Sequence, residues 1–177
     1  MMEQNSQRTE GFKGGIQSGS SAYDDLSRKM NIRLTKIKRT LATELLPLGY
    51  SMKVGIDGSD HSILRRGMSP DGGIWFDPSG KAICAFETKK QGIRGNAHER
   101  WFKNYMFIGH IYSGIRYVTF LAGEGCDSGM ASDFKTLMEM HNRKFDVLYP
   151  DGLSFFSRAD GFTETEICEI MRKGILQ

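Results

Sequence analysis

The chain has 177 residues, of which 39% are hydrophobic and 25% charged, and its formal net charge is only +3. This size suits one domain with a substantial core, and so small a net charge does not by itself indicate an acidic partner. No run of about 18 apolar residues predicts a transmembrane helix, and the first residues lack the apolar stretch of a secretion signal. We therefore expect a cytoplasmic protein with no membrane partner.

The cysteines and histidines do not predict a metal or disulfide framework. Cys84, Cys126 and Cys168 lie far apart, without the Cys-x-x-Cys spacing of zinc sites. Their odd number and scatter predict reduced thiols in a cytoplasm. The four histidines also lack the spacing of metal ligands.

The N-terminal part of the chain divides into an arm and a helix. Residues 1–21 are polar and rich in Gly, Ser and Gln, which predicts a flexible arm preceding one domain over 22–177. Apolar residues then recur at helical spacing over 26–45, until Pro47 and Gly49 end the pattern. This helix is expected to cover the core.

A β-hairpin is predicted over 70–91, after a loop over 50–69 that holds at most one short strand. Two β-prone runs flank the loop 78–80, and its final glycine should adopt a left-handed conformation. Both faces of the hairpin are apolar, as in strands that lie mid-sheet with helices on both sides. One face is expected to carry Ile74, Phe76, Ala82, Cys84 and Phe86, with the Cys84 thiol as a packing group, and the other to carry Trp75, Ile83 and Ala85.

The open end of this hairpin gathers charge. If Asp77 pairs with Lys81, antiparallel register places Asp71 directly opposite Glu87. Lys89 lies on the same face, because strand side chains alternate. Opposed carboxylates repel, and a divalent cation between them would reverse the sign of the interaction. The arrangement predicts a metal site, with a purely structural hairpin as the alternative.

Basic residues form two clusters, one on the N-terminal helix and one beside the hairpin. Local basic clusters near a metal site favour a phosphate-bearing substrate. A solvated helix face explains the first cluster equally well. The clusters comprise Arg28, Lys29, Arg33, Lys36, Lys38 and Arg39, and then Lys89, Lys90, Arg94, Arg100 and Lys103.

A second helix is predicted after the hairpin, with Asn96 and Glu99 as a capping-box-like start and Gly114 as its end. Its apolar stripe of Trp101, Tyr105, Ile108 and Tyr112 is expected to pack in the core or to contribute to a dimer interface. The remaining predicted elements are a buried strand over 117–122, a helix over 134–141, a strand over 145–149 and a helix over 164–171. Together these elements predict a mixed α/β domain.

Two carboxylates and a lysine in a basic surround suit hydrolysis of a phosphodiester. A bound metal lowers the pKa of a water and neutralises charge on the phosphate. Asp71 and Glu87 would be metal ligands. Lys89 would orient or activate the attacking water, or stabilise the phosphorane. The sequence holds neither Gly-x-Ser-x-Gly nor His-Glu-x-x-His as a competing motif.

The motifs in this region resemble a known family. Pro70-Asp71 with Glu87-Thr88-Lys89 resembles the PD-(D/E)xK nuclease signature. The following residues, Lys90-Gln91-Gly92 and Arg94-Gly95-Asn96-Ala97-His98-Glu99-Arg100, are similar to the EcoRI/MunI group of type II restriction endonucleases. The likeness covers about 68–124, and the loop over 91–95 is shorter than in that group.

The resemblance implies a mixed central β-sheet flanked by helices and a Mg²⁺-dependent homodimer that cuts a palindrome in double-stranded DNA. It implies Asp71, Glu87 and the carbonyl of Thr88 as metal ligands, and Lys89 as a catalytic residue. It also implies a prokaryotic cytoplasm and a cognate DNA methyltransferase in the same host, with no direct contact implied. The expected DNA contacts are Lys90, Arg94, Gly95, Asn96, Ala97, His98 and Arg100.

Three of these residues would read an AATT centre, since Asn suits adenine and Arg contacts purine N7. These readers are Asn96, Ala97 and Arg100. Arg94 occupies the place where the MunI-like pattern reads the guanine of an outer C:G pair, which makes CAATTG the predicted site. The alternative is that Arg94 only grips a phosphate.

Two rival functions remain open. One is a catalytically idle DNA-binding protein on the same scaffold, and the other is a repair or recombination nuclease of low specificity. The intact Asp71, Glu87 and Lys89 argue against the first, and the base-reading segment argues against the second.

Overall fold

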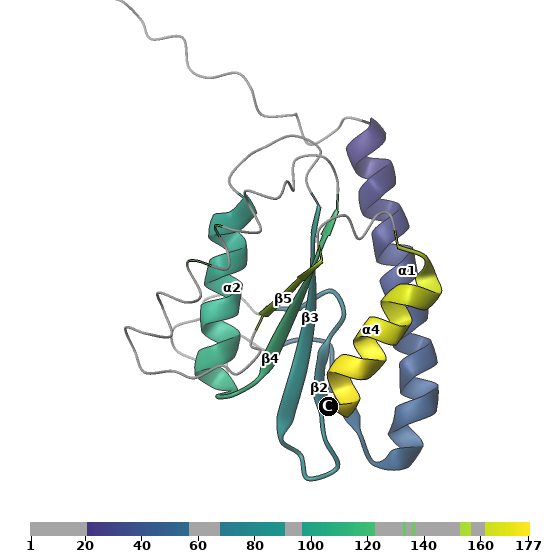
Figure 1. The fold of residues 1–177 in the computed structure, drawn as a ribbon, viewed down its shortest axis with the longest axis vertical. Helices are drawn as coiled ribbons and strands as arrows, with labels where there is room; N and C mark the ends of the chain where they lie inside the picture. Colours follow the sequence, from purple (N-terminus) through teal and green to yellow (C-terminus); the bar gives the residue numbers. More distant parts are fainter. Residues whose placement is uncertain are drawn as a thin grey trace, which may run out of the picture.

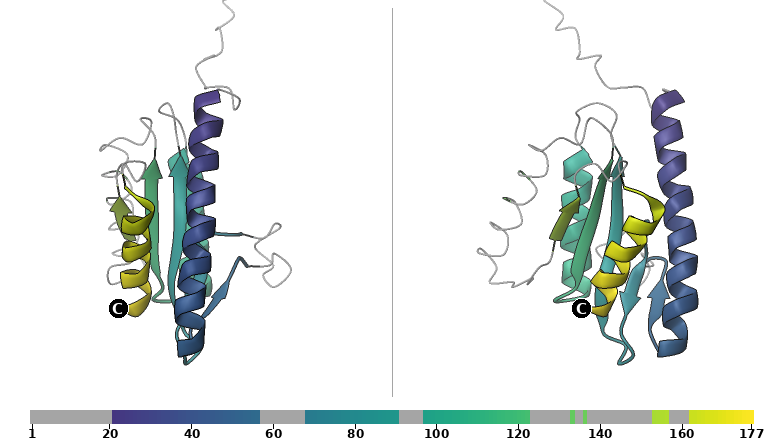
Figure 2. Two further views of the ribbon diagram at one scale, coloured as in Figure 1. Left: turned by 90° about the vertical axis from the view of Figure 1, so that its right-hand side faces the viewer. Right: turned by 45° about the vertical axis from the view of Figure 1, so that its right-hand side comes forward.

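The computed structural model describes residues 21–56, 68–90, 97–122, 133, 136, 153–156 and 162–177. A five-stranded mixed sheet with the order β1-β2-β3-β4-β5 forms its centre (Figure 1). Helix α2 covers one face of the sheet, and α1 and α4 cover the other (Figure 2). The predicted α/β class, with a central mixed sheet flanked by helices, is confirmed. Within the described ranges, no helix is long and apolar enough to cross a membrane.

The sheet combines an antiparallel meander with parallel strands. The meander consists of β1 (Ser51–Lys53), β2 (Ile74–Phe76) and β3 (Ala82–Lys90), and β4 (Arg116–Ala122) and β5 (Leu153–Phe156) continue it in parallel. The helices are α1 (Ser21–Leu45), the 3₁₀ helix η1 (Leu46–Leu48), α2 (Ala97–Ile111) and α4 (Glu164–Leu176). Because β3 and β4 are parallel, their connection crosses the sheet through α2. This places β3 at the centre, as its apolar faces predicted.

Several predicted elements lie partly or wholly outside the described residues. These are the strand over 145–149, most of the helix over 134–141, where Thr136 is helical, as is Asp133 just before it, and the arm over 1–21 except its last residue. That residue, Ser21, begins α1, so the predicted boundary of the arm is wrong there. Strand β5 was not predicted from the sequence. Helix α4 begins at the predicted residue but continues to Leu176, and a capping box of Thr163 and Glu166 fixes its start.

The turn of the hairpin forms as predicted. The N–H of Asp77 donates to the carbonyl of Lys81 at 2.9 Å, and Gly80 has φ 82°. One oxygen of the Asp77 carboxylate accepts hydrogen bonds from the backbone of Ser79 and of Lys81, and the hydrogen bond from the Ser79 side chain contributes most to lowering the pKa of Asp77.

The predicted assignment of side chains to the two hairpin faces holds up to Ile83 and is wrong beyond it, for Cys84, Ala85 and Phe86. Phe76 pairs with Ala82, whereas Trp75 pairs with Cys84, so Ile83 is an extra residue in β3. Such a β-bulge reverses the face of every side chain on one side of it. Cys84 and Phe86 therefore lie with Trp75, not with Ile74.

Each face of the sheet packs its own core cluster. Under α2, Ile74, Ala85, Tyr117 and Leu121 are buried with side chains of the helix. On the other face, the apolar stripe of α1 and that of α4 pack against a second set, namely Trp75, Cys84, Phe86, Val118 and Phe120. Burial raises the pKa of the Cys84 thiol, which agrees with its predicted role as a packing group.

The aromatic stripe of α2 belongs to the core of one subunit. Tyr105 and Ile108 are 1% and 0% exposed, and Tyr112 packs against the same cluster. Of the two alternatives for this stripe, packing in the core is therefore confirmed for Tyr105 and Ile108, and a dimer contact through these two buried side chains is excluded. The side chain of Trp101 lies outside the described residues.

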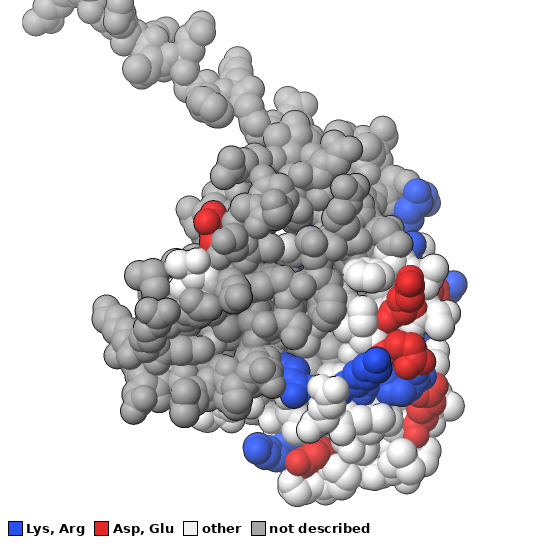
Figure 3. Space-filling view, viewed as in Figure 1, with Lys and Arg blue, Asp and Glu red and all other residues white. Residues whose placement is uncertain are grey.

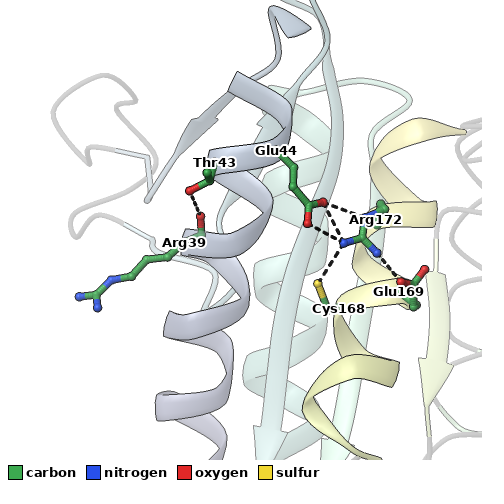
Figure 4. Close-up of polar contacts among 6 residues, drawn as sticks. All are labelled: Arg39, Thr43, Glu44, Cys168, Glu169 and Arg172. Carbon is green, nitrogen blue, oxygen red and sulfur yellow. Dashed lines mark hydrogen bonds and ion pairs between the residues drawn. The ribbon is translucent and has the colours of Figure 1, made fainter. Parts of the chain in front are cut away.

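Polar contacts join α1 to α4. The Arg172 guanidinium donates to both carboxylate oxygens of Glu44 at 2.9 Å and also pairs with Glu169 (Figure 4). Arg33 donates to the carbonyl of Phe162 at 2.9 Å. Figure 3 shows acidic and basic side chains side by side over these two helices. Part of the basic cluster of α1 therefore stabilises the fold.

Candidate active site

A glycine turn before β2 positions Asp71. The N–H of Gly73 donates to the carbonyl of Pro70 at 2.9 Å, and Gly73 has φ 80°. A Cβ at Gly73 would also lie 2.8 Å from the sulfur of Met52. Because only glycine adopts this conformation without strain, the Pro70-Asp71-Gly72-Gly73 run shapes the start of the site.

Asp71 reaches Glu87 through a second irregularity in the pairing. Continuing the register of Ile74 with Ala85 would place Asp71 opposite Thr88. However, Phe86 accepts a hydrogen bond from the N–H of Gly72 and donates one to the carbonyl of Gly73. Gly72 and Gly73 therefore both lie opposite Phe86. This second bulge cancels the one-residue change of register that the bulge at Ile83 causes.

The carboxylate of Asp71 is held by the backbone of β3. Its Oδ2 accepts a hydrogen bond from the N–H of Thr88 at 3.0 Å. The N–H and C=O of a strand residue point to the same edge, so the carbonyl of Thr88 lies on the side of Asp71. The Asp71 carboxylate and the Thr88 carbonyl thus lie beside the end of β3 that carries Glu87.

Glu87 and Lys89 form an ion pair on the face covered by α2. The Nζ of Lys89 donates to Oε1 of Glu87, and the two side chains are 15% and 7% exposed. Glu87 pairs in register with Thr119 on β4, which is fully buried. A charged pair on a central strand next to the core indicates a specialised site, because burying ions costs several kcal/mol each.

Burial and a second carboxylate oppose the charged form of Glu87, whereas Lys89 supports it. Burial raises the pKa of Glu87, the charge of Lys89 lowers it, and the charge of Asp71 raises it again. Burial, and then the charges of Glu87 and Asp71, also raise the pKa of Tyr117. The charge of Asp71 therefore acts on Glu87, and both carboxylates act on the phenol of Tyr117.

The donors at this end of β3 fit a hard divalent cation. Mg²⁺ prefers carboxylate and carbonyl oxygens and is held by one or two carboxylates plus substrate phosphate. Asp71, Glu87 and Thr88 offer that set. In the described part of the chain, no group of three or more His, Cys, Asp or Glu side chains could hold a metal.

The expected DNA contacts are only partly described. Lys90 points away from Lys89, and its Nζ donates to Oδ1 of Asn31 on α1 at 2.9 Å. Arg94, Gly95 and Asn96 lie outside the described residues. The first turn of α2 contains Ala97, His98 and Arg100. The structure describes the backbone of these three residues but not their side chains.

Sequence reasoning missed two features of the site. Asn31 is a partner of Lys90 from a distant helix, which no local pattern indicates. Tyr117 and Thr119 form a buried polar backing to Glu87, and their alternation along β4 with apolar neighbours was the available signal.

We expect Glu87→Gln to raise the melting temperature of the metal-free protein at neutral pH. The pKa of Glu87 is raised in the folded state. Its contribution to stability is therefore complete at pH values below the pKa of the unfolded chain, and it is lost as the pH rises through the pKa of the folded protein. Gln mimics the protonated form and does not titrate. Calorimetric melting at several pH values should show equal stabilities below about pH 4 and a widening gap above it. A variant less stable than wild type at pH 8 would contradict this.

No family model matches this chain, and neither a curated protein nor a solved structure matches it.

Proposed function

We propose that the chain is a Mg²⁺-dependent, sequence-specific endonuclease of the type II restriction kind that acts on double-stranded DNA. The single observation that carries the proposal is the convergence of Asp71, Glu87 and Lys89 at one end of the central strand. These are the residues in which the sequence resembles the PD-(D/E)xK signature, and the mixed sheet with helices on both faces is compatible with that fold. A prokaryotic cytoplasm with a cognate DNA methyltransferase in the host would be its setting.

The residues divide the chemistry between them. Asp71, Glu87 and the carbonyl of Thr88 would hold Mg²⁺, which supplies a water of lowered pKa and neutralises charge on the phosphate. Attack by water forms a new P–O bond and breaks the bond to the leaving sugar oxygen. Lys89 would orient the water or stabilise the negative charge that develops on the phosphorus oxygens.

The edge of the sheet at which β3 ends also suits a phosphate backbone. Strand β3 ends at Lys90 and α2 begins at Ala97, and both ends lie at the same edge in Figure 1. The N-terminus of a helix carries the positive end of its dipole and free N–H groups. DNA at this edge would meet the carboxylates, Lys89 and the expected base-reading residues, of which Ala97 and Arg100 lie in the first turn of α2.

Digestion of a plasmid of known sequence tests this proposal most directly. With Mg²⁺ we expect discrete fragments, because cleavage at a specific site cuts at fixed positions. A smear would favour a nuclease of low specificity, and retarded but uncut DNA would favour an idle binding protein. Omitting Mg²⁺ or adding a chelator should abolish the discrete fragments.

We expect the active form to be a two-fold dimer. A palindromic site presents two identical half-sites, and protein symmetry mirrors them. Light scattering coupled to gel filtration should give twice the chain mass of 19.9 kDa for the free protein. A monomer both free and on its specific duplex would exclude this assembly.

A further inference from the structure

We propose that Lys89 is the resident cation of the carboxylate site: in the metal-free protein its ammonium takes the place of the divalent metal at Glu87, and metal binding displaces it. This inference rests on the proposed function and adds a regulation of the same site. Lys89 would then be kept from the substrate until the metal is loaded.

The contacts of the site support this exchange. The Nζ of Lys89 donates directly to Oε1 of Glu87, and both side chains are largely buried. Asp71 is fixed beside them by the N–H of Thr88. Two carboxylates in a poorly hydrated site need a nearby positive charge, and Lys89 supplies it.

A metal and the ammonium cannot use the same carboxylate oxygen in the same way. Mg²⁺ needs the lone pairs of its ligands at about 2.0–2.1 Å, whereas the ammonium occupies them as a hydrogen-bond donor. In the proposed exchange, Mg²⁺ takes the Oε1 that Lys89 holds, which breaks the pair of Lys89 with Glu87. The flexible four-carbon stem of lysine lets the released ammonium move toward the water and the phosphate.

The neighbouring lysine offers a matched control. Lys90 carries the same charge one residue further along β3, but it lies on the other face and donates to Asn31. Lys89→Met and Lys90→Met thus change the net charge equally. Only the first removes a competitor for Glu87.

Calorimetric titration of the full chain with Mg²⁺, in the absence of DNA, tests whether Lys89 competes with the metal. We expect Lys89→Met to bind Mg²⁺ about tenfold more tightly than wild type, the order of a hydrogen bond to a charged group. Lys90→Met should bind as wild type does. Equal or weaker binding by Lys89→Met would overturn the exchange while leaving the metal site intact. No Mg²⁺ binding by any of the three proteins would overturn the metal site itself.

A measurement on the wild-type chain covers the case in which Lys89→Met does not fold. Reductive methylation followed by mass spectrometry reports how accessible each lysine is. Adding Mg²⁺ should speed the methylation of Lys89 several-fold and leave that of Lys90 unchanged. An unchanged rate at Lys89 under Mg²⁺ concentrations that support cleavage would show that the pair stays closed.

Discussion

Asp71→Asn and Glu87→Gln should each slow Mg²⁺-dependent DNA cleavage by at least about a thousandfold. A metal supplies several kcal/mol of transition-state stabilisation, and every 1.36 kcal/mol is a factor of ten in rate. Each substitution keeps the shape of the side chain and removes only its charge, so the loss would report on metal binding. Single-turnover cleavage of a specific duplex measures it.

Asp77→Asn is the matched control for these variants. Asp77 lies in the same hairpin, but at its turn, where its carboxylate accepts hydrogen bonds from Ser79 and Lys81. We expect this variant to cleave within a few-fold of wild type. Lys89→Met should lose cleavage as well but keep specific DNA binding in a gel-shift assay, because its role is chemical. Cleavage by Glu87→Gln at nearly the wild-type rate would falsify the metal-site interpretation.

Arg94→Ala should relax the outer base pair of the recognition site. Arg donates two hydrogen bonds to guanine O6 and N7, and a good bidentate contact contributes about 1–3 kcal/mol of discrimination, which is a preference of roughly 5- to 150-fold. Wild type should cut CAATTG, and Arg94→Ala should accept other outer pairs around AATT. Sequencing the ends cut from a duplex library with randomised flanks measures both.

Lys103→Ala provides the comparison for a change of charge alone. Lys103 is an exposed residue of α2 whose Nζ lies 5.7 Å from the centre of the Phe107 ring. Loss of the Lys103 charge should weaken binding to all DNA sequences equally or not at all, so the preferred site should stay the same. An even loss of binding for Arg94→Ala too would show that Arg94 grips a phosphate. Fragment ends without AATT would exclude both interpretations.

Local signals were sufficient for most elements of this fold. Helical spacing predicted α1 and the start of α4, and the glycine at residue 80 predicted the hairpin turn, because these patterns depend on neighbouring residues alone. The same patterns placed Asp71, Glu87 and Lys89 at one end of the hairpin. The apolar character of both strand faces also predicted β3 at the centre of the sheet.

The tertiary structure decided what depends on distant packing. The bulge at Ile83 moves Cys84 and Phe86 to the side of α1 and α4, where they pack with Trp75, and a one-residue shift of this kind has no local signature. The pairing of β5 with β4 and the contact of Lys90 with Asn31 join residues far apart in the chain. The sequence by itself therefore determined the chemistry gathered at the end of the hairpin. Only the folded sheet decided how Asp71 comes opposite Glu87 and which partner Lys90 finds on α1, because both depend on backbone register and on the helices packed against each face.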